Sequence, residues 1–419
     1  MSKEHQGYIP RLVDKHISLQ LKTMGAVLIE GPKWCGKTRT SLQHSESVFY
    51  TTDNRELARN LPNQVLEGDV PRLIDEWQLE PVLWDRARRI VDERAAPGQF
   101  IFTGSSTSTA KEIAHSGVGR FAPVRMGTLS LFESGESNGA VSLADLFDGK
   151  AITFQENTAS LESVVWALCR GGWPATLNLD TEAASLVAPN YVNLMQQNEF
   201  TSSSKGAPLD VQKLQLFIQG LARNTAQATS LSTIISDVRE RAGTLARATA
   251  ENYLNNLKSV FFAVEQPSWN VSLRSKAALR QMPKRHLADP SLAAAALGAT
   301  PEKLLKDYRT LGHLFESLCY RDMCAYAHAI NASVLYYRDS NNFEVDQIVA
   351  TADGRWAALE VKLGTEQIDE TAKQLSELVE KVDTRHIGEP SFLGILYSGQ
   401  YAYTRDDGVH VIPLSCLRP

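Results

Sequence analysis

The 419-residue chain has no apolar run that approaches the roughly 20 residues a membrane helix needs. Its first residues, Met1 to Gln6, lack the apolar core of a secretion signal. Cysteine is scarce: the five cysteines are scattered, and none pairs with another at C-x-x-C spacing. These absences argue against a membrane-spanning protein, a disulfide-stapled fold and a cysteine-based zinc site, so we expect a cytoplasmic protein with free thiols.

A large excess of charge of one sign is also absent. The net charge is -5, so the chain as a whole is not a generic binder of polyanions. With 43% hydrophobic and 22% charged residues, the composition is that of an ordinary soluble globular protein. Because the chain is too long for one ordinary hydrophobic core, we expect two or three domains.

A phosphate-loop motif, G-x-x-x-x-G-K-T, stands near the N-terminus, between an apolar run and a predicted helix. The motif consists of Gly31, Pro32, Lys33, Trp34, Cys35, Gly36, Lys37 and Thr38, and Arg39 follows it. Its glycines allow backbone N–H groups to point at phosphate oxygens, and the helix start adds partial positive charge. We expect all nine residues to bind ATP, with Lys37 on the β- and γ-phosphates and Thr38 on Mg²⁺. The alternative is a chance glycine-rich turn.

An apolar strand that ends in Asp75 and Glu76 follows about 40 residues after the loop. In a nucleotide-hydrolysing site, Asp75 would hold Mg²⁺ through water and Glu76 would polarise the attacking water. Acidic residues also end many strands without any such role, which is the alternative here.

The next apolar run, from Gln99 to Phe102, ends in Thr-Gly-Ser-Ser. Thr103 or Ser105 could contact the γ-phosphate or the lytic water, although a Gly/Ser turn without any contact fits the residues equally well.

Arg120 stands on a glycine-rich loop before a predicted strand from Pro123 to Leu131. Such an arginine can neutralise phosphate charge in a neighbouring subunit, which would require a homo-oligomer. Arg125 is the second candidate for this role, and a solvated surface charge is the alternative for both.

Together these segments alternate between strands and helices, which predicts an α/β domain with a mostly parallel sheet. Their order resembles the prokaryotic AAA-type ATPases that carry a C-terminal domain of unknown function with a nuclease-like fold. The resemblance continues through Gly171-Gly172-Trp173-Pro174, a turn found between the two halves of those proteins, and covers most of the chain.

The middle of the chain begins with a polar, irregular connection at 134–160, after which helices are predicted. Between 211 and 265 the pattern predicts three helices and a β-type run, which resembles a winged helix-turn-helix. Residues 211–285 hold eleven Lys and Arg against four Asp and Glu. A local positive surface suits nucleic-acid phosphates, whereas a solvated face or a contact with an acidic neighbouring domain is the alternative.

Towards the C-terminus, Glu316 lies on a predicted helix, and Asp346, Glu360 and Lys362 lie on a predicted hairpin that turns at Gly354. Asp…Glu-x-Lys on a hairpin is the pattern of PD-(D/E)XK nucleases. Glu316, Asp346 and Glu360 would ligate Mg²⁺ through carboxylate oxygens, and Lys362 would position water and stabilise the phosphate. Gln374, on the next helix, would support the site. The motif is short, and a nuclease-like fold can lose its activity.

The predicted fold class is therefore α/β in three parts: a P-loop AAA-type ATPase domain (1–150), a helical linker with a winged-helix-like domain (151–290) and a restriction-endonuclease-like domain (291–419). The predicted function is a Mg-ATP-dependent ATPase coupled to a nuclease-like, nucleic-acid-interacting domain. Two alternatives stay open: an ATP-dependent metal nuclease, or an ATP-controlled binding switch whose nuclease-like domain is inactive.

Overall fold

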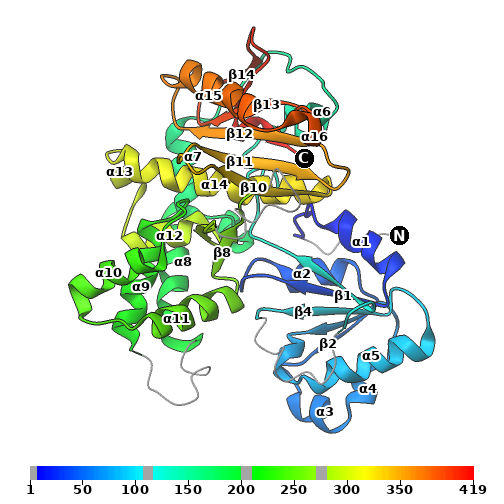
Figure 1. Ribbon diagram of the computed structural model, residues 1–419. Helices are drawn as coiled ribbons and strands as arrows, with labels where there is room; N and C mark the ends of the chain where they lie inside the picture. Colours follow the sequence, from blue (N-terminus) through cyan, green and yellow to red (C-terminus); the bar gives the residue numbers. More distant parts are fainter. Residues whose placement is uncertain (1–6, 107–116, 200–209, 270–280) are drawn as a thin grey trace. The chain divides into compact units, whose positions relative to one another are not determined.

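The computed structural model describes residues 7–106, 117–199, 210–269 and 281–419 (Figure 1). The chain forms two compact units, one of Met1–Thr128 with Leu257–Phe262 and one of Leu129–Asn256 with Ala263–Pro419. The N-terminal stretch of the first unit therefore ends before residue 150, and residues 151–290, apart from Leu257–Phe262, share a unit with residues 291–419. The division into three domains stays a prediction. Part of the basic middle stretch, residues 270–280, lies outside the described residues.

The first unit is built on a five-stranded, all-parallel sheet with the strand order β2-β3-β4-β1-β5. The strands are β1 (Ala26–Glu30), β2 (Ser47–Tyr50), β3 (Arg72–Asp75), β4 (Phe100–Gly104) and β5 (Phe121–Arg125). The helices are α1 (Asp14–Thr23), α2 (Lys37–Gln43), α3 (Arg55–Asn60), α4 (Pro62–Leu66) and α5 (Val82–Arg94), with a 3-10 turn at Trp77–Leu79. The last strand is shorter than the predicted Pro123 to Leu131.

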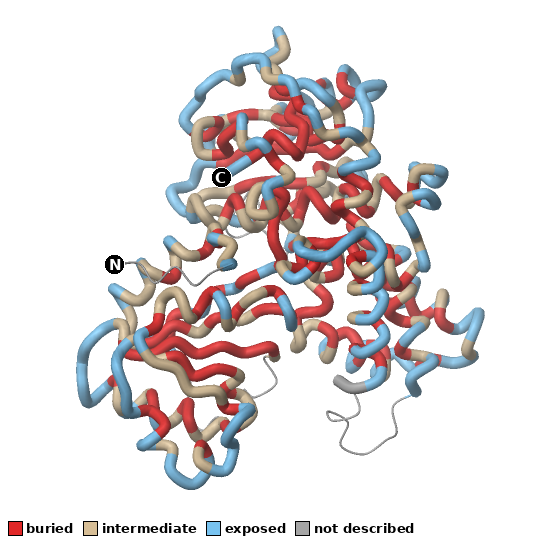
Figure 2. The backbone as a smooth tube through the Cα atoms, turned by 180° about the vertical axis from the view of Figure 1, so that it is seen from behind, coloured by how far each residue is buried: buried red, intermediate tan, exposed pale blue. Residues whose placement is uncertain are grey.

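Both faces of this sheet are covered, because apolar side chains alternate along its strands. Ala26 and Phe100 join a buried cluster with residues of α3, α4 and α5. Their neighbours Val27 and Ile101 join a second cluster with Ile17 of α1 on the other face. In Figure 2 the sheet is mostly buried along β1, β3 and β4, whereas β2, at its edge, is half-buried. The result is the helix–sheet–helix layering expected for an α/β domain.

The second unit carries the rest of the chain. Its helices are α6 (Leu143–Phe147), α7 (Leu161–Arg170), α8 (Thr181–Leu194), α9 (Val211–Arg223), α10 (Leu231–Ala242), α11 (Arg247–Ser259, whose last turn belongs to the first unit), α12 (Pro290–Leu297), α13 (Pro301–Leu304), α14 (Tyr308–Ala329), α15 (Ile368–Lys381) and α16 (Thr384–Ile387). Short turns of other helix types cover Pro174–Asn178, Met195–Glu199 and Leu414–Cys416.

A seven-stranded mixed sheet with the order β10-β11-β12-β13-β15-β14-β7 organises the C-terminal part of this unit. Its strands are β7 (Gln155–Glu156), β10 (Ala332–Arg338), β11 (Glu344–Thr351), β12 (Trp356–Lys362), β13 (Leu393–Tyr397), β14 (Tyr401–Thr404) and β15 (His410–Pro413). Figure 1 shows α14 and α15 on opposite sides of β10, β11 and β12. The antiparallel pair β11–β12 is the hairpin that the sequence predicts around Gly354.

Two small sheets complete the unit: β6 (Val141–Ser142) pairs with β16 (Leu417–Arg418), and β8 (Ala263–Gln266) pairs with β9 (Lys284–Leu287). The connection at 134–160 is therefore not irregular throughout, because it holds β6, α6 and β7. The three helices α9, α10 and α11 and the β8–β9 pair follow the predicted order.

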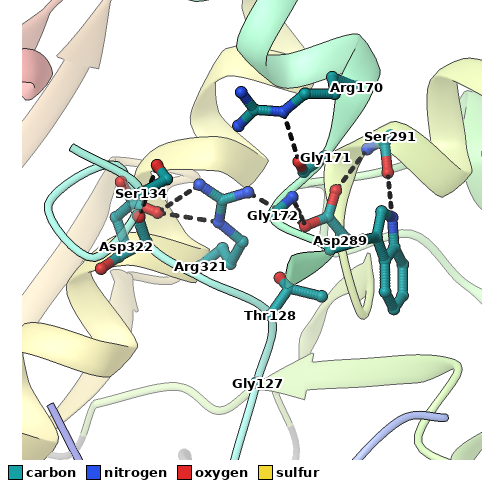
Figure 3. Close-up of polar contacts among 12 residues, drawn as sticks. Gly127, Thr128, Ser134, Arg170, Gly171, Gly172, Asp289, Ser291, Arg321 and Asp322 are labelled. Carbon is teal, nitrogen blue, oxygen red and sulfur yellow. Dashed lines mark hydrogen bonds and ion pairs between the residues drawn. The ribbon is translucent and has the colours of Figure 1, made fainter. Parts of the chain in front are cut away.

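A buried polar network holds distant segments of the second unit together (Figure 3). Arg321 of α14 donates to Asp289, which precedes α12, at 3.0 Å and forms an ion pair with Asp322 at 2.7 Å. Asp289 also accepts a hydrogen bond from the backbone N–H of Gly172, and Asp322 accepts one from Leu131. Both carboxylates are fully buried.

The five cysteines are free thiols. Within the described ranges, no helix combines the length and the apolar character that crossing a membrane requires.

Candidate nucleotide site and C-terminal acidic cluster

In the first unit, the parallel sheet gathers the predicted nucleotide residues at one edge. The strands β3, β4 and β1 lie side by side, and each is followed by predicted site residues at its carboxyl end. Because parallel strands end at the same edge, the phosphate loop, the Asp-Glu pair and Thr103 come together there. The intervening strand β4 places Thr103 between the other two groups.

The phosphate loop curls tightly between β1 and α2. Gly36 has φ 102° and Trp34 has φ 68°, so two residues of the loop adopt left-handed backbone. At Gly31 an added Cβ would lie 2.0 Å from the carbonyl oxygen of Met126, which leaves no room for a side chain. Lys37 is buried, and its Nζ donates to the carbonyl oxygens of Gly31 at 2.9 Å and Pro32 at 2.8 Å.

The remaining loop residues differ in exposure. Lys33 and Arg39 are exposed, and Trp34 is 64% exposed despite its large apolar ring. Cys35 is fully buried, with its Sγ 3.6 Å from the carbonyl oxygen of Met126. The cysteine therefore acts as a small packing residue within the loop.

Asp75 lies at the centre of the acidic side of this edge. Its Oδ1 accepts hydrogen bonds from the hydroxyls of Thr38 at 2.8 Å and Thr103 at 2.6 Å. Burial raises the pKa of the Asp75 carboxyl, while these two hydrogen bonds act in the opposite direction. The hydrogen bond from Thr38 to Asp75 sets a hydroxyl beside a carboxylate, so the two residues fit a Mg²⁺ that Thr38 would ligate and Asp75 would hold through water.

Glu76 adopts a left-handed backbone conformation, with φ 52°, directly after β3. Its backbone N–H donates to the Thr103 hydroxyl at 3.1 Å. Its Oε2 accepts from the Ser105 hydroxyl at 2.8 Å and from the side-chain amide of Gln78. Non-glycine residues hold such a backbone conformation only where the surrounding structure fixes it. The hydrogen bonds of the Glu76 backbone N–H and of its Oε2 therefore hold both the backbone and the carboxylate in place. Thr103 and Ser105 contact the two acidic residues, and so does Gln78, for which no motif predicts a role.

Arg11 is a second residue that sequence reasoning missed. Its guanidinium donates to the carbonyl oxygens of Cys35 at 2.8 Å, Gly127 at 2.9 Å and Thr128 at 3.2 Å. It is buried in the segment just before α1, which carries no motif, so only the three-dimensional contact identifies it. Arg11 links the phosphate loop to the last residues of the first unit.

The two candidate arginine fingers lie at opposite ends of β5: Arg120 precedes the strand and Arg125 ends it. Arg120 immediately precedes β5, and its carbonyl accepts from Ala26 at the start of β1. Its side chain forms an ion pair with Asp92 at 2.6 Å. Arg125 pairs in register with Glu30, at the phosphate-loop edge. Arg120 is therefore distant from the loop of its own chain, and its action on a neighbouring subunit stays a prediction.

In the second unit, Asp346, Glu360 and Lys362 lie on the β11–β12 hairpin, and Glu316 approaches from α14. Glu360 accepts from the backbone N–H of Asp346 at 3.1 Å and from Lys362 Nζ at 3.1 Å. Asp346 accepts from the backbone N–H of Val361 at 3.0 Å. The predicted residues of this C-terminal acidic cluster are thus brought together. Gln374 instead binds the backbone carbonyl of Glu344, at 2.8 Å.

A further cation, Lys284 of β9, lies inside this cluster. Its Nζ is 2.6 Å from Glu316, 2.8 Å from Glu344 and 2.9 Å from Asp346, and its side chain is 1% exposed. Lys284 is one of the eleven basic residues from which the sequence predicts a positive surface. For Lys284 that prediction is wrong, because the residue is buried among carboxylates. No motif marks the pairing, since Lys284 is more than 30 residues from each partner.

The pKa values of the carboxyl groups in the cluster depend on burial and on the ammonium of Lys284. Burial raises the pKa of Glu316 well above its usual range, and burial together with Asp346 raises the pKa of Glu360 to about 7. Burial acts in the same direction on Asp346, but Lys284 and Lys362 outweigh it and lower its pKa. Across the described ranges of the chain, no group of three or more His, Cys, Asp or Glu side chains is arranged to hold a metal ion. Binding of Mg²⁺ by Glu316, Asp346 and Glu360 stays a prediction.

Other basic residues of the middle stretch are partly neutralised. Arg223 forms an ion pair with Asp237, and Arg247 forms one with Glu251. Near the end of α10, Arg239 and Arg241 are exposed.

Three stretches of the chain match family models. Residues 23–134 match the family described as "AAA domain". The N-terminal part is thus similar to AAA-type ATPase domains. Residues 161–303 match "Domain of unknown function (DUF8612)", and residues 311–417 match "Domain of unknown function (DUF4143)". The AAA-type domain supports an ATPase function, and neither of the other two families carries a described activity.

Two similar solved structures are more distant. The Walker-type ATPase PABY2304 of Pyrococcus abyssi is 14% identical with a TM-score of 0.44, and the similarity covers 69% of this chain and 96% of that one. The replication initiator DnaA, bound to AMPPCP and single-stranded DNA, is 11% identical with a TM-score of 0.26 over 59% of this chain and 86% of that one. No curated protein matches the chain.

Proposed function

We propose that the chain is a Mg-ATP-dependent ATPase whose hydrolytic site is the edge formed by the phosphate loop, Asp75 and Glu76. The observation that carries this proposal is the hydrogen bond from Thr38 to Asp75 beside an independently oriented Glu76. The hydroxyl of Thr38 and the carboxylates of Asp75 and Glu76 thus lie close together beside the phosphate loop. Lys37 of this loop is buried.

Each of these residues has a defined task when the substrate ATP binds. Lys37 exchanges its bonds to the loop carbonyls for bonds to the β- and γ-phosphates. Thr38 directly and Asp75 through water would hold Mg²⁺, which would neutralise charge that develops on the phosphates. Glu76 accepts a hydrogen bond from the attacking water and orients it towards the γ-phosphate, while Ser105 and Gln78 hold the carboxylate in place.

Steady-state release of phosphate from ATP and Mg²⁺ tests this proposal in the full chain. Lys37→Ala removes the ammonium that contacts the phosphates, and we expect it to abolish both turnover and tight ATP binding. Lys22→Ala, which removes an exposed lysine at the end of α1 in the same unit, is the matched control and should retain most of the activity. Equal turnover of the wild type and Lys37→Ala would exclude this site.

The second unit is proposed to bind nucleic acid under control of the ATPase. Support comes from the exposed arginines at the end of α10, Arg239 and Arg241, which can contact phosphates from one helix end. Replacing both with Ala should lower the slope of log affinity for DNA against log salt by about two, since each phosphate contact releases roughly one counterion. Arg385→Ala, an exposed arginine elsewhere in the unit, is the control. Unchanged salt dependence in the double variant would move the search to protein partners.

Between the two remaining roles for the C-terminal part, the structure favours the binding switch over the metal nuclease. The acidic cluster is filled by the ammonium of Lys284. Metal-dependent DNA cleavage that Asp346→Ala abolishes would reverse this preference.

A further inference from the structure

The β8–β9 pair presents three buried polar side chains to the C-terminal sheet and α14. Gln266 donates to the backbone carbonyls of Leu335 and Asp346, at 2.9 and 2.8 Å. His286 pairs with Ser317 of α14 at 3.1 Å and with Gln266 at 3.2 Å. These contacts fix the pair of strands against the acidic cluster, with Lys284 on the same side of β9 as His286.

Lys284 is fully coordinated inside the cluster. An ammonium has three N–H donors, and three carboxylate oxygens lie within hydrogen-bonding distance, at 2.6, 2.8 and 2.9 Å. The partners come from two elements: Glu316 from α14, and Glu344 and Asp346 from β11. The Nζ also lies 5.7 Å from the ring centroid of Tyr336.

We propose that the ammonium of Lys284 is the resident cation of the acidic cluster and takes the place that a divalent metal would need. Its three partners include two of the three carboxylates that the nuclease resemblance assigns to metal. A divalent ion that used Glu316 and Asp346 would lie next to the ammonium, where like-charge repulsion opposes its binding. The β8–β9 pair thus closes the site from within the chain, independently of the ATPase site.

The charge balance supports this assignment. The cluster holds four carboxyl groups, those of Glu316, Glu344, Asp346 and Glu360, and two ammonium groups, those of Lys284 and Lys362. Two positive charges of the chain itself therefore lie among these carboxyl groups, and both form ion pairs with them.

The proposal predicts that removing the ammonium opens a metal site. Mn²⁺ uptake, followed by electron paramagnetic resonance without nucleotide, is compared among the wild-type full chain, Lys284→Met and Lys362→Met. Lys284→Met should bind one more Mn²⁺ per chain than the wild type, and this gain should disappear in Lys284→Met/Asp346→Asn. Lys362→Met also removes an ammonium from the cluster but leaves Lys284 in place, so it should show no gain.

Melting curves provide a second measurement. Mn²⁺ should raise the melting temperature of Lys284→Met and leave that of the wild type unchanged. If Lys284→Met does not fold, the wild type and Asp346→Asn decide the matter, because the proposal predicts the same Mn²⁺ uptake for both. Uptake by the wild type that Asp346→Asn abolishes would overturn the proposal, as would a gain in Lys362→Met equal to that in Lys284→Met.

Discussion

Replacing Arg321 with Met tests the buried network of the second unit. The guanidinium lies between Asp289 and Asp322, both 0% exposed, and its own side chain is 8% exposed. Methionine fills much of the same volume but leaves two buried carboxylates without their cation. Breaking a buried ion pair by removing one partner typically costs about 3–5 kcal/mol.

The carboxylates retain part of their support, which places the expected loss within that range rather than above it. Asp289 keeps the N–H groups of Gly172 and Ser291, and Asp322 keeps that of Leu131. At roughly 2–4 °C per kcal/mol for a large domain, the melting transition of the second unit should fall by roughly 10 °C.

The effect should also depend on pH. Burial raises the pKa of Asp322 to about 6 against the opposing effect of Arg321, so loss of the arginine raises it further. A carboxyl whose folded pKa is raised contributes stability below its unfolded pKa and loses it as pH rises through the folded pKa. The deficit of Arg321→Met should therefore be larger at pH 8 than at pH 5.

Scanning calorimetry at both pH values measures this. Arg385→Met is the matched control, because Arg385 also pairs with an aspartate but its side chain is 87% exposed. It should leave the transition unchanged. A shift for Arg321→Met no larger than that of the control would refute the assigned role of the network.

Three further outcomes are expected. Gly31→Ala, whose Cβ would lie 2.0 Å from a carbonyl oxygen, should weaken ATP binding at least about tenfold, whereas Gly127→Ala, with open space around its Cβ, should not; equilibrium dialysis compares them. Arg120→Ala should lower ATP turnover of the assembled protein by roughly 10³-fold if it acts in trans, and unchanged turnover would exclude that role. Burial, aided by Lys284, lowers the pKa of His286 to about 3, so stability should fall as pH drops from about 6.5 towards 3. Acid titration of His286→Gln should show a shallower loss, and an identical slope would contradict the assignment.

Local patterns predicted the phosphate loop, the hairpin of Asp346 and Glu360, and the order of α9, α10 and α11. Each of these depends on neighbouring residues, whose spacing fixes either a turn or the face of a helix or strand. The AAA-type match over residues 23–134 supports the first of them.

Long-range contacts were not accessible in the same way. Arg11 contacts Gly127, 116 positions away, and Lys284 contacts Asp346, 62 positions away. No motif marks Arg11 or Lys284. The connection at 134–160 looked irregular because β6 and β7 are short and acquire partners only from β16 and β14 at the far end of the chain. Pairing partners that lie so far apart decide what these short segments become.

The most direct test of the central claim is the rate of hydrolysis of ATP bound beforehand to the full chain, after addition of Mg²⁺. Glu76→Gln keeps the phosphate loop and Asp75 intact but removes the carboxylate that orients the water. If Glu76 orients the attacking water, this variant binds ATP as the wild type does and hydrolyses it about 10²–10⁴-fold more slowly. Hydrolysis by Glu76→Gln at the wild-type rate, or none by the wild type, would rule out this role of Glu76.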